Sequence, residues 1–424
     1  MRKFLIATWV ALLSTVTLQA QLKVAVVSDI HVMVPELVEQ DGAAFQDYVA
    51  HDRKLLMESV ALAEAAVDEL LSGRPDAVLV TGDLTKDGER VSHEYVAGQL
   101  LARLRRAGIP VYVVPGNHDV NNPHARIYRG DEAPRTATVS REEFAALYDD
   151  YGYGTALARD TASLSYVVQL NDSVRLLAVD ACRYDENDFE ANECVVGGRI
   201  RPRTLDFIEE QARLAQEAGC RMFVMMHHGL VRHWKWQDLA MGDYLVEHWR
   251  RCARLFGRCG LQVVFTGHFH AQDVAAFGQG DRRVYDIETG STVSYPLPVR
   301  FVCLEGDTLA VRSVRLGDTG RLDVGLEPRA LAYAEAGIAT IVGDIVGDAV
   351  PEELVHRAGE LVGEAYVAHI AGDERMPEAY AERLKEVCRQ VRPYSWKYAF
   401  LLEHLARYLS TDAAPQDNEV EILL

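Results

Sequence analysis

Five short apolar runs, each followed by residues of the kinds that bind metal ions, constrain the fold of this chain more than any other feature. Each run is rich in Val, Leu and Ile and is bounded by Gly or Pro, which is typical of a strand buried on both faces. Sites in layered α/β folds gather beyond the carboxyl ends of such strands, so we expect the five endings to meet at one edge. The residues that follow the runs are Asp29 and His31, Asp83, Asn117 and His118, His227 and His228, and His268 and His270.

The spacing within these endings also suits metal binding. Residues two apart in an extended segment project from the same side, so the Asp-x-His and His-x-His endings each offer a pair of ligands. A glycine precedes Asp83, Asn117 and His268, and glycine allows a tight turn close to a cation. Each motif alone could be a cap, a turn or a buried histidine pair. However, six of the 14 histidines fall at these strand ends, which favours one shared site.

With all five motifs in this order, from Asp29 to His270, the chain resembles the calcineurin-like metallophosphoesterase superfamily. The resemblance implies that Asp83 bridges two metal ions and that His118 is the general acid, with Asp119 orienting it. It implies the remaining ligands as two groups: Asp29, His31 and His270 for the first ion, and Asn117, His227 and His268 for the second. Four further residues are candidates for supporting the ligands or lining the substrate pocket: His228, His124, Lys86 and Arg126.

The expected chemistry needs these residue types. Hydrolysis of a phosphate ester requires a nucleophile at neutral pH and neutralisation of charge on the phosphoryl oxygens, and two cations about 3.5 to 4 Å apart supply both. Mixed imidazole, carboxylate and amide ligands favour Mn, Fe or Zn over Mg or Ca. We expect a metal-bridged hydroxide to attack the phosphorus while His118 protonates the departing oxygen.

Departures from familiar branches of the superfamily narrow the expected substrate. Lys86 stands three residues after the bridging aspartate, where purple acid phosphatases have a tyrosine, and Asp119 stands where protein phosphatases have a glutamate. The nearer resemblance is to the bacterial cyclic-nucleotide phosphodiesterase and glycerophosphodiesterase branch. We therefore expect an enzyme that hydrolyses a small phosphodiester. The alternatives are a phosphomonoesterase of the acid or nucleotide phosphatase kind, and a non-catalytic binding module that keeps the fold.

The arrangement of apolar segments predicts an α/β protein. The strand-like runs alternate with helix-patterned stretches, and Asn171-Asp172 between two β-rich runs indicates a hairpin. Together with the resemblance, this predicts a four-layer α-β-β-α sandwich over residues 21–327. From about Pro328 the pattern becomes helical, which predicts a small helical appendage over 328–411, with Ser395 capping its last helix. The acidic tail at 412–424 is expected to be poorly ordered.

The N-terminal segment and the overall charge bear on location and partners. Arg2 and Lys3 precede an apolar stretch that ends in small residues up to Ala20, the layout of a signal peptide over residues 1–20. We therefore expect export to the periplasm or the medium, without stable membrane insertion because no later stretch reaches about 20 apolar residues. The formal net charge of -19 disfavours nucleic-acid binding. The family resemblance implies a small phosphate ester as the partner. The pairing of the seven cysteines and the oligomeric state stay open.

Overall fold

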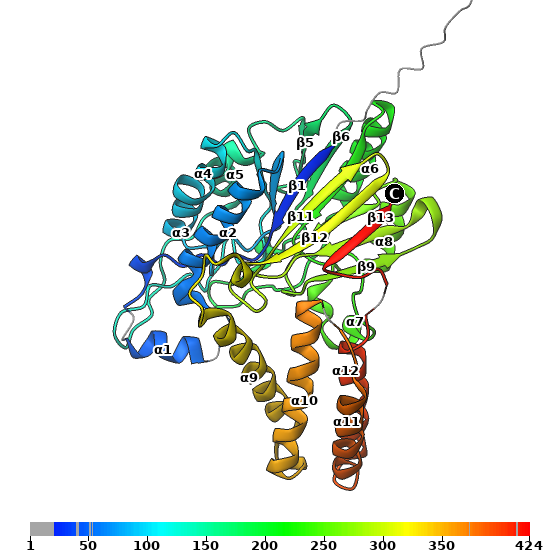
Figure 1. Ribbon diagram of the computed structural model, residues 1–424. Helices are drawn as coiled ribbons and strands as arrows, with labels where there is room; N and C mark the ends of the chain where they lie inside the picture. The colour runs from blue at the N-terminus through cyan, green and yellow to red at the C-terminus, as the bar shows by residue number, and fades with distance from the viewer. Residues whose placement is uncertain (1–20, 40–41, 51, 53, 373, 413) are drawn as a thin grey trace, which may run out of the picture.

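Two β-sheets form the centre of the computed structural model, which describes residues 21–424 except 40–41, 51, 53, 373 and 413 (Figure 1). The expected signal peptide at 1–20 lies outside the described residues. The first sheet contains β1 (Leu22–Val27), β2 (Ala77–Val80), β3 (Val111–Val113), β11 (Pro298–Glu305), β12 (Thr308–Arg315) and β13 (Glu419–Leu423). The second contains β4 (Ala158–Arg159), β5 (Tyr166–Asn171), β6 (Val174–Val179), β7 (Arg221–Met226), β8 (Val263–Thr266), β9 (Asp273–Phe277) and β10 (Val284–Glu288).

The order and direction of the strands bring the five predicted motifs to one edge. The first sheet has the order β13-β12-β11-β1-β2-β3, and the second has the order β4-β5-β6-β7-β8-β10-β9. Strands β1, β2 and β3 run parallel to one another, as do β6, β7, β8 and β10. Strands β5 and β6 form the predicted hairpin around Asn171. Five of these parallel strands, β1, β2, β3, β7 and β8, end immediately before the five motifs.

Helices cover the outer faces of both sheets. Those of the sandwich are α1 (Ala43–Ala50), α2 (Ser59–Gly73), α3 (Arg90–Tyr95), α4 (Ala102–Arg106), α5 (Arg141–Leu147), α6 (Pro202–Glu217), α7 (Gln237–Ala240) and α8 (Trp249–Arg258). A π-helical segment, Val96–Leu101, joins α3 to α4. Leu62 and Leu70 of α2 pack on the first sheet, and Ile208 of α6 and Phe256 of α8 pack on the second. The predicted four-layer α-β-β-α architecture is therefore confirmed.

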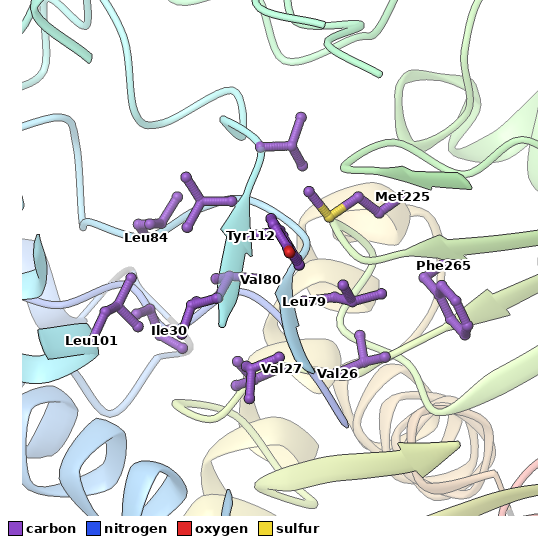
Figure 2. Packing of buried hydrophobic residues seen from close by; sticks show 14 of the residues in the cluster. Val26, Val27, Ile30, Leu79, Val80, Leu84, Leu101, Tyr112, Met225 and Phe265 are labelled. Carbon is purple, nitrogen blue, oxygen red and sulfur yellow. The ribbon is translucent and has the colours of Figure 1, made fainter. Parts of the chain in front are cut away.

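The period of two along each strand divides its side chains between the two faces of its sheet. Val26 of β1 and Leu79 of β2 point toward the second sheet, where Met225 of β7 and Phe265 of β8 face them (Figure 2). Val224 of β7 instead packs on the opposite side, in the cluster formed with α6 and α8. Because both faces of the central strands are covered, these strands are nearly continuous apolar runs, as the sequence indicated.

Four further helices form the appendage and extend away from the sheets (Figure 1). They are α9 (Leu326–Val346), α10 (Glu352–Ala371), α11 (Glu378–Val391) and α12 (Trp396–Leu409). Ser395 caps α12, as predicted, by accepting a hydrogen bond from the Tyr398 backbone N–H. The helices share their own apolar cluster, which also includes Trp234 from the sandwich. The carboxyl end of α10 joins the sandwich, where Gln272 N donates to the Ile370 carbonyl at 3.0 Å.

The expectation of a poorly ordered acidic tail is wrong. Residues Glu419–Leu423 form β13, which pairs antiparallel with β12 at the edge of the first sheet. The tail is acidic overall, but burial alternates along its strand. Ile422 is buried, and its neighbours Glu421 and Leu423 are exposed. The chain thus returns to the sandwich after the appendage, and the appendage is inserted between two neighbouring strands.

Two further observations concern membranes and cysteines. None of the helices among the described residues has both the length and the apolarity needed to cross a membrane. All seven cysteines lie in the described part of the chain and are free thiols.

Candidate metal centre

The side chains of the seven predicted ligands converge in two groups at the carboxyl edge of the sheets. In the first group, Asp29 Oδ1 lies 3.2 Å from His270 Nε2, which in turn lies 3.3 Å from His31 Nε2. In the second group, His227 Nε2 lies 3.1 Å from Asn117 Oδ1. Asp83, His227 and His268 offer ligand atoms within 4.8 Å of one another.

Asp83 lies between the two groups. Its Oδ2 atom is 3.6 Å from His31 Nε2 in the first group and 3.3 Å from His227 Nε2 in the second. Its other oxygen, Oδ1, accepts a hydrogen bond from the His118 backbone N–H at 2.9 Å. Burial alone would raise the pKa of Asp83, but the imidazoles of His227 and His118 outweigh burial and hold this pKa well below its usual value. A charged carboxylate therefore sits where the resemblance places the bridging ligand.

The backbone at five of the seven positions adopts the sterically costly left-handed region. The φ angles are 51° at Asp29, 40° at His31, 49° at Asp83, 75° at His268 and 67° at His270. Residues with side chains avoid this region unless the surrounding structure imposes it, and such strain clusters at functional sites. The turns after β1, β2 and β8 therefore hold these side chains in place at a cost to stability.

Two glycines make room for this packing. A Cβ atom on Gly116 would lie 2.0 Å from Asp83 Oδ1, and one on Gly267 would lie 1.9 Å from Ser28 Oγ and 2.5 Å from Asp29 Oδ2. All three distances are far below van der Waals contact. These two glycines thus let the Asp83 carboxylate pack against the turn after β3 and the Asp29 carboxylate against the turn after β8.

Replacing Gly267 with alanine should destabilise the protein by about 1–3 kcal/mol, because the methyl group must displace Ser28 and Asp29. Thermal unfolding measured by calorimetry would report this loss. The matched control is Gly98→Ala, since a Cβ atom at helical Gly98 meets no atom within 4 Å. An unfolding temperature for Gly267→Ala as high as that of the control would contradict the close approach of β8 to β1.

The first group contains a buried carboxylate oxygen, Asp29 Oδ1, whose surroundings suit a cation. Asp29 Oδ2 accepts hydrogen bonds from the Ser28 hydroxyl and from the His268 backbone N–H. Asp29 Oδ1 is buried, and among the described residues no donor bonds to it. A buried carboxylate oxygen without a donor is costly unless a cation binds it. The oxygen lies beside two imidazole nitrogens, and this set of donors suits a transition-metal ion.

His118 lies beside Asp83, and its orienting partner differs from the one expected. His118 Nδ1 lies 2.8 Å from Asp87 Oδ1, so Asp87 rather than Asp119 orients the ring. Asp119 instead accepts hydrogen bonds from the backbone N–H groups of Gly116, Leu84 and Thr85, which ties the turn after β3 to the turn after β2. Asp87 follows Asp83 by only four residues, and this short spacing is the feature of the sequence that could have identified it.

Lys86 is a buried support for Asp87. Its ammonium group pairs with the Asp87 carboxylate, lies 3.9 Å from Glu89 and sits 4.2 Å from the centre of the Tyr48 ring. Lys86 therefore contacts the partner of His118, and it is not among the residues lining the cavity beside the candidate metal centre.

The other three supporting candidates occupy different places. His228 lies behind the ligands, with its ring centre 4.4 Å from that of His268 and its Nε2 atom 2.9 Å from the Val196 carbonyl. His124 and Arg126 both bond to Asn192, and neither is among the described residues that line the cavity. Their bonds to Asn192 thus hold His124 and Arg126 away from the lining of this cavity.

A cavity of about 280 Å³ opens beside the candidate metal centre. Lys54 is a cation at its rim, and Tyr244 and Phe269 provide aromatic surface. Ala334 of α9 and Tyr366 and Ile370 of α10 complete its wall, so the appendage takes part in the pocket. Sequence reasoning missed Lys54 and these appendage residues, since no local motif marks them.

Strained turns and grouped imidazole and carboxylate side chains beside a cavity are the arrangement that a metal-dependent hydrolase needs. The family model described as calcineurin-like phosphoesterase matches residues 22–272. The chain therefore belongs to the calcineurin-like phosphoesterase family, whose members act on phosphoesters, and the expected family is confirmed.

Two individual proteins illustrate the similarity. The chain is 25% identical over 236 residues to a probable cyclic nucleotide phosphodiesterase from Psychrobacter sp. (strain PRwf-1), a match that covers 54% of this chain and 58% of that relative. The crystal structure of a dimetal phosphatase from Danio rerio superimposes with a TM-score of 0.51 at 14% identity. That superposition covers 70% of this chain and 96% of the other, and it supports the fold.

Proposed function

We propose that this protein is an exported phosphodiesterase that binds two transition-metal ions, Mn, Fe or Zn, and hydrolyses a small phosphodiester. The observation that carries the proposal is the position of the Asp83 carboxylate, 3.6 Å from His31 and 3.3 Å from His227. One carboxylate shared by two groups of ligands is what a pair of closely spaced cations requires. Asp29, His31 and His270 would hold one ion, and Asn117, His227 and His268 the other.

When bound, the two ions supply a nucleophile from water at neutral pH and neutralise charge on the phosphoryl oxygens. The protein contributes the geometry around them. The Asp29 carboxylate is fixed by Ser28 and by the His268 backbone, and His227 Nδ1 lies 2.9 Å from the Thr81 carbonyl, which orients its Nε2 atom toward Asp83. Such contacts behind the ligands hold them in position and set their orientation.

His118 is suited to protonate the leaving group. Burial alone would lower the pKa of His118, but the carboxylates of Asp83 and Asp87 outweigh it and raise this pKa. With Asp87 accepting a hydrogen bond from the Nδ1–H group, Nε2 is the ring nitrogen that faces the candidate metal centre, 3.9 Å from Asp83 Oδ2. A proton held on that side of the ring is available to an oxygen departing beside the ions.

The proposed substrate class is supported by the side chains that line the cavity and by the description of the similar protein from Psychrobacter. Tyr244, Phe269 and Tyr366 offer flat surfaces for an organic group, and the Lys54 ammonium offers a charge for a phosphate oxygen. The appendage limits the length of a substrate. A cyclic nucleotide or a glycerophosphodiester fits these features, and the relative from Psychrobacter is described as a probable cyclic nucleotide phosphodiesterase.

A comparison of esters tests the proposal. With manganese present, turnover of bis-nitrophenyl phosphate should exceed that of nitrophenyl phosphate by about tenfold or more in kcat/KM, a difference of about 1.4 kcal/mol. Cyclic nucleotides and glycerophosphodiesters would follow as candidate natural substrates. Negligible activity on the diester with strong activity on the monoester would establish the phosphomonoesterase alternative instead.

Export is part of the same proposal, and it rests on the charged and apolar pattern of residues 1–20. Fractionation of cells producing the full chain would place the protein outside the cytoplasm. A cytoplasmic protein that retains this segment would contradict export without affecting the proposed chemistry.

A further inference from the structure

A second buried cluster of histidine and carboxylate side chains lies where the appendage and the tail meet the second sheet. Asp273 of β9, His369 of α10 and Glu374 beyond α10 offer ligand atoms within 4.8 Å of one another. Glu374 belongs in the same way to a second group with Asp412 and Asp417, between α12 and β13. No residue of this cluster belongs to the candidate metal centre described above.

The contacts in this cluster resemble an incomplete coordination shell. His369 Nδ1 lies 2.6 Å from Glu374 Oε1 and 3.6 Å from Asp273 Oδ2. The Glu374 and His369 side chains are 2% and 1% exposed. Glu374 Oε2 and Asp417 Oδ2 are both buried, and no donor among the described residues bonds to either. Two carboxylate oxygens that face one cluster without a donor point to a cation.

The charges around the cluster do not balance. His233 Nδ1 lies 2.8 Å from Asp273 Oδ1, and its Nε2 atom lies 3.5 Å from both Asp286 and Glu288. The buried acidic side chains are Asp273, Asp286, Glu288, Glu374 and Asp417, and the buried basic ones are His233, His369 and Arg300. His369 is neutral when it binds a metal ion, so even with His233 protonated the negative charge is in excess by three. A divalent cation would reduce that excess to one.

We propose that Asp273, His369, Glu374 and Asp417 bind a third divalent transition-metal ion, of which Zn²⁺ is representative. One imidazole nitrogen and three carboxylate oxygens would give the ion four protein ligands. Four protein ligands leave no open position for a substrate, which distinguishes a structural zinc site from a catalytic one. The ligands come from β9, α10, the connection to α11 and the connection to β13. The ion fastens the appendage and the returning chain to the sandwich.

The proposed ion would also help to fix the shape of the cavity beside the candidate metal centre. Tyr366 and Ile370, which line the cavity, flank His369 on α10, and the His369 ring packs 5.6 Å from the ring of Phe269, which also lines it. An ion bound to His369 fixes the last turn of α10 and with it one wall of the cavity. The third ion is thus a structural element of the pocket and takes no part in bond cleavage.

The test is a count of zinc ions. The full chain would be stripped with a chelator, dialysed against Zn²⁺ and measured by mass spectrometry. We expect three zinc ions per chain in the unmodified protein and one fewer in Glu374→Gln, which keeps the size of the side chain. The matched control is Glu360→Gln on α10, where the exposed carboxylate pairs with His356 at 3.4 Å, and it should lose none.

Two further measurements keep this site separate from the catalytic one. Asp83→Asn should lose zinc from the catalytic centre and still retain the ion at Glu374. An anomalous-scattering map of zinc-loaded crystals of the unmodified protein should show a peak between Asp273 and His369, which needs no variant to fold. Absence of that peak, or full zinc retention by Glu374→Gln, would overturn the third site, and the carboxyl groups would then share protons.

Discussion

Replacing Asp83 with asparagine should reduce kcat/KM for bis-nitrophenyl phosphate by at least about 10³-fold, or about 4 kcal/mol of transition-state stabilisation. The amide keeps the shape of the side chain and removes the charge that faces His31 and His227. Without that charge, two cations repel each other at close range. Metal analysis of the same sample should show loss of catalytic ions together with the loss of activity.

Asp206→Asn is the matched control for this experiment. Asp206 lies on the exposed face of α6, so the same chemical change there should leave both activity and metal content unaltered. Retention of more than a tenth of the activity by Asp83→Asn would contradict the role of this carboxylate as a bridge. It would also remove the main support for the proposed function, which is argued from the position of Asp83 between the two groups of ligands.

Replacing His118 with asparagine should lower kcat by roughly 10²- to 10³-fold on a diester with an alkoxide leaving group. The loss should be much smaller on a nitrophenyl ester, because nitrophenolate departs without needing a proton. Metal content should stay at the level of the unmodified protein, since His118 acts on the leaving group. Steady-state rates on the two kinds of ester, measured beside metal analysis, separate these effects.

His356→Asn provides the control for this variant, because His356 is an exposed histidine on α10. Loss of metal from His118→Asn equal to that from Asp83→Asn would assign His118 to metal binding and refute its role as an acid. Equal losses of kcat on both kinds of ester would likewise refute proton donation.

The sequence predicted the centre of this molecule well because the relevant signals are local. A β-branched run followed by glycine and a ligand residue specifies a buried strand and the turn after it, at Asp83 and at His268 alike. Strand polarity then requires the turns to meet at one edge. The prediction failed for the partner of His118, because Asp87 and Asp119 are both near in sequence and only the packing of the two turns distinguishes them.

Longer-range features had no local signal. The tail was expected to be poorly ordered because its composition is acidic and its alternating pattern is short. It forms β13 because the edge of β12 is available for pairing. His369 and Glu374 look like ordinary residues of an amphipathic helix and its connection. They gain significance only when Asp273 and Asp417, distant in sequence, are folded beside them.

Local chemistry therefore determined from the sequence alone that this chain builds a sheet edge carrying carboxylate and imidazole side chains suited to metal binding, and that the remaining C-terminal part is mainly helical. The tertiary structure alone decided which carboxylate orients His118, that the appendage forms a wall of the cavity, and that a second buried group of potential ligands exists. The physical reason is the range of the interactions. Periodicity and turn chemistry act over a few residues, whereas burial and unpaired charge depend on which distant segments exclude water from one another.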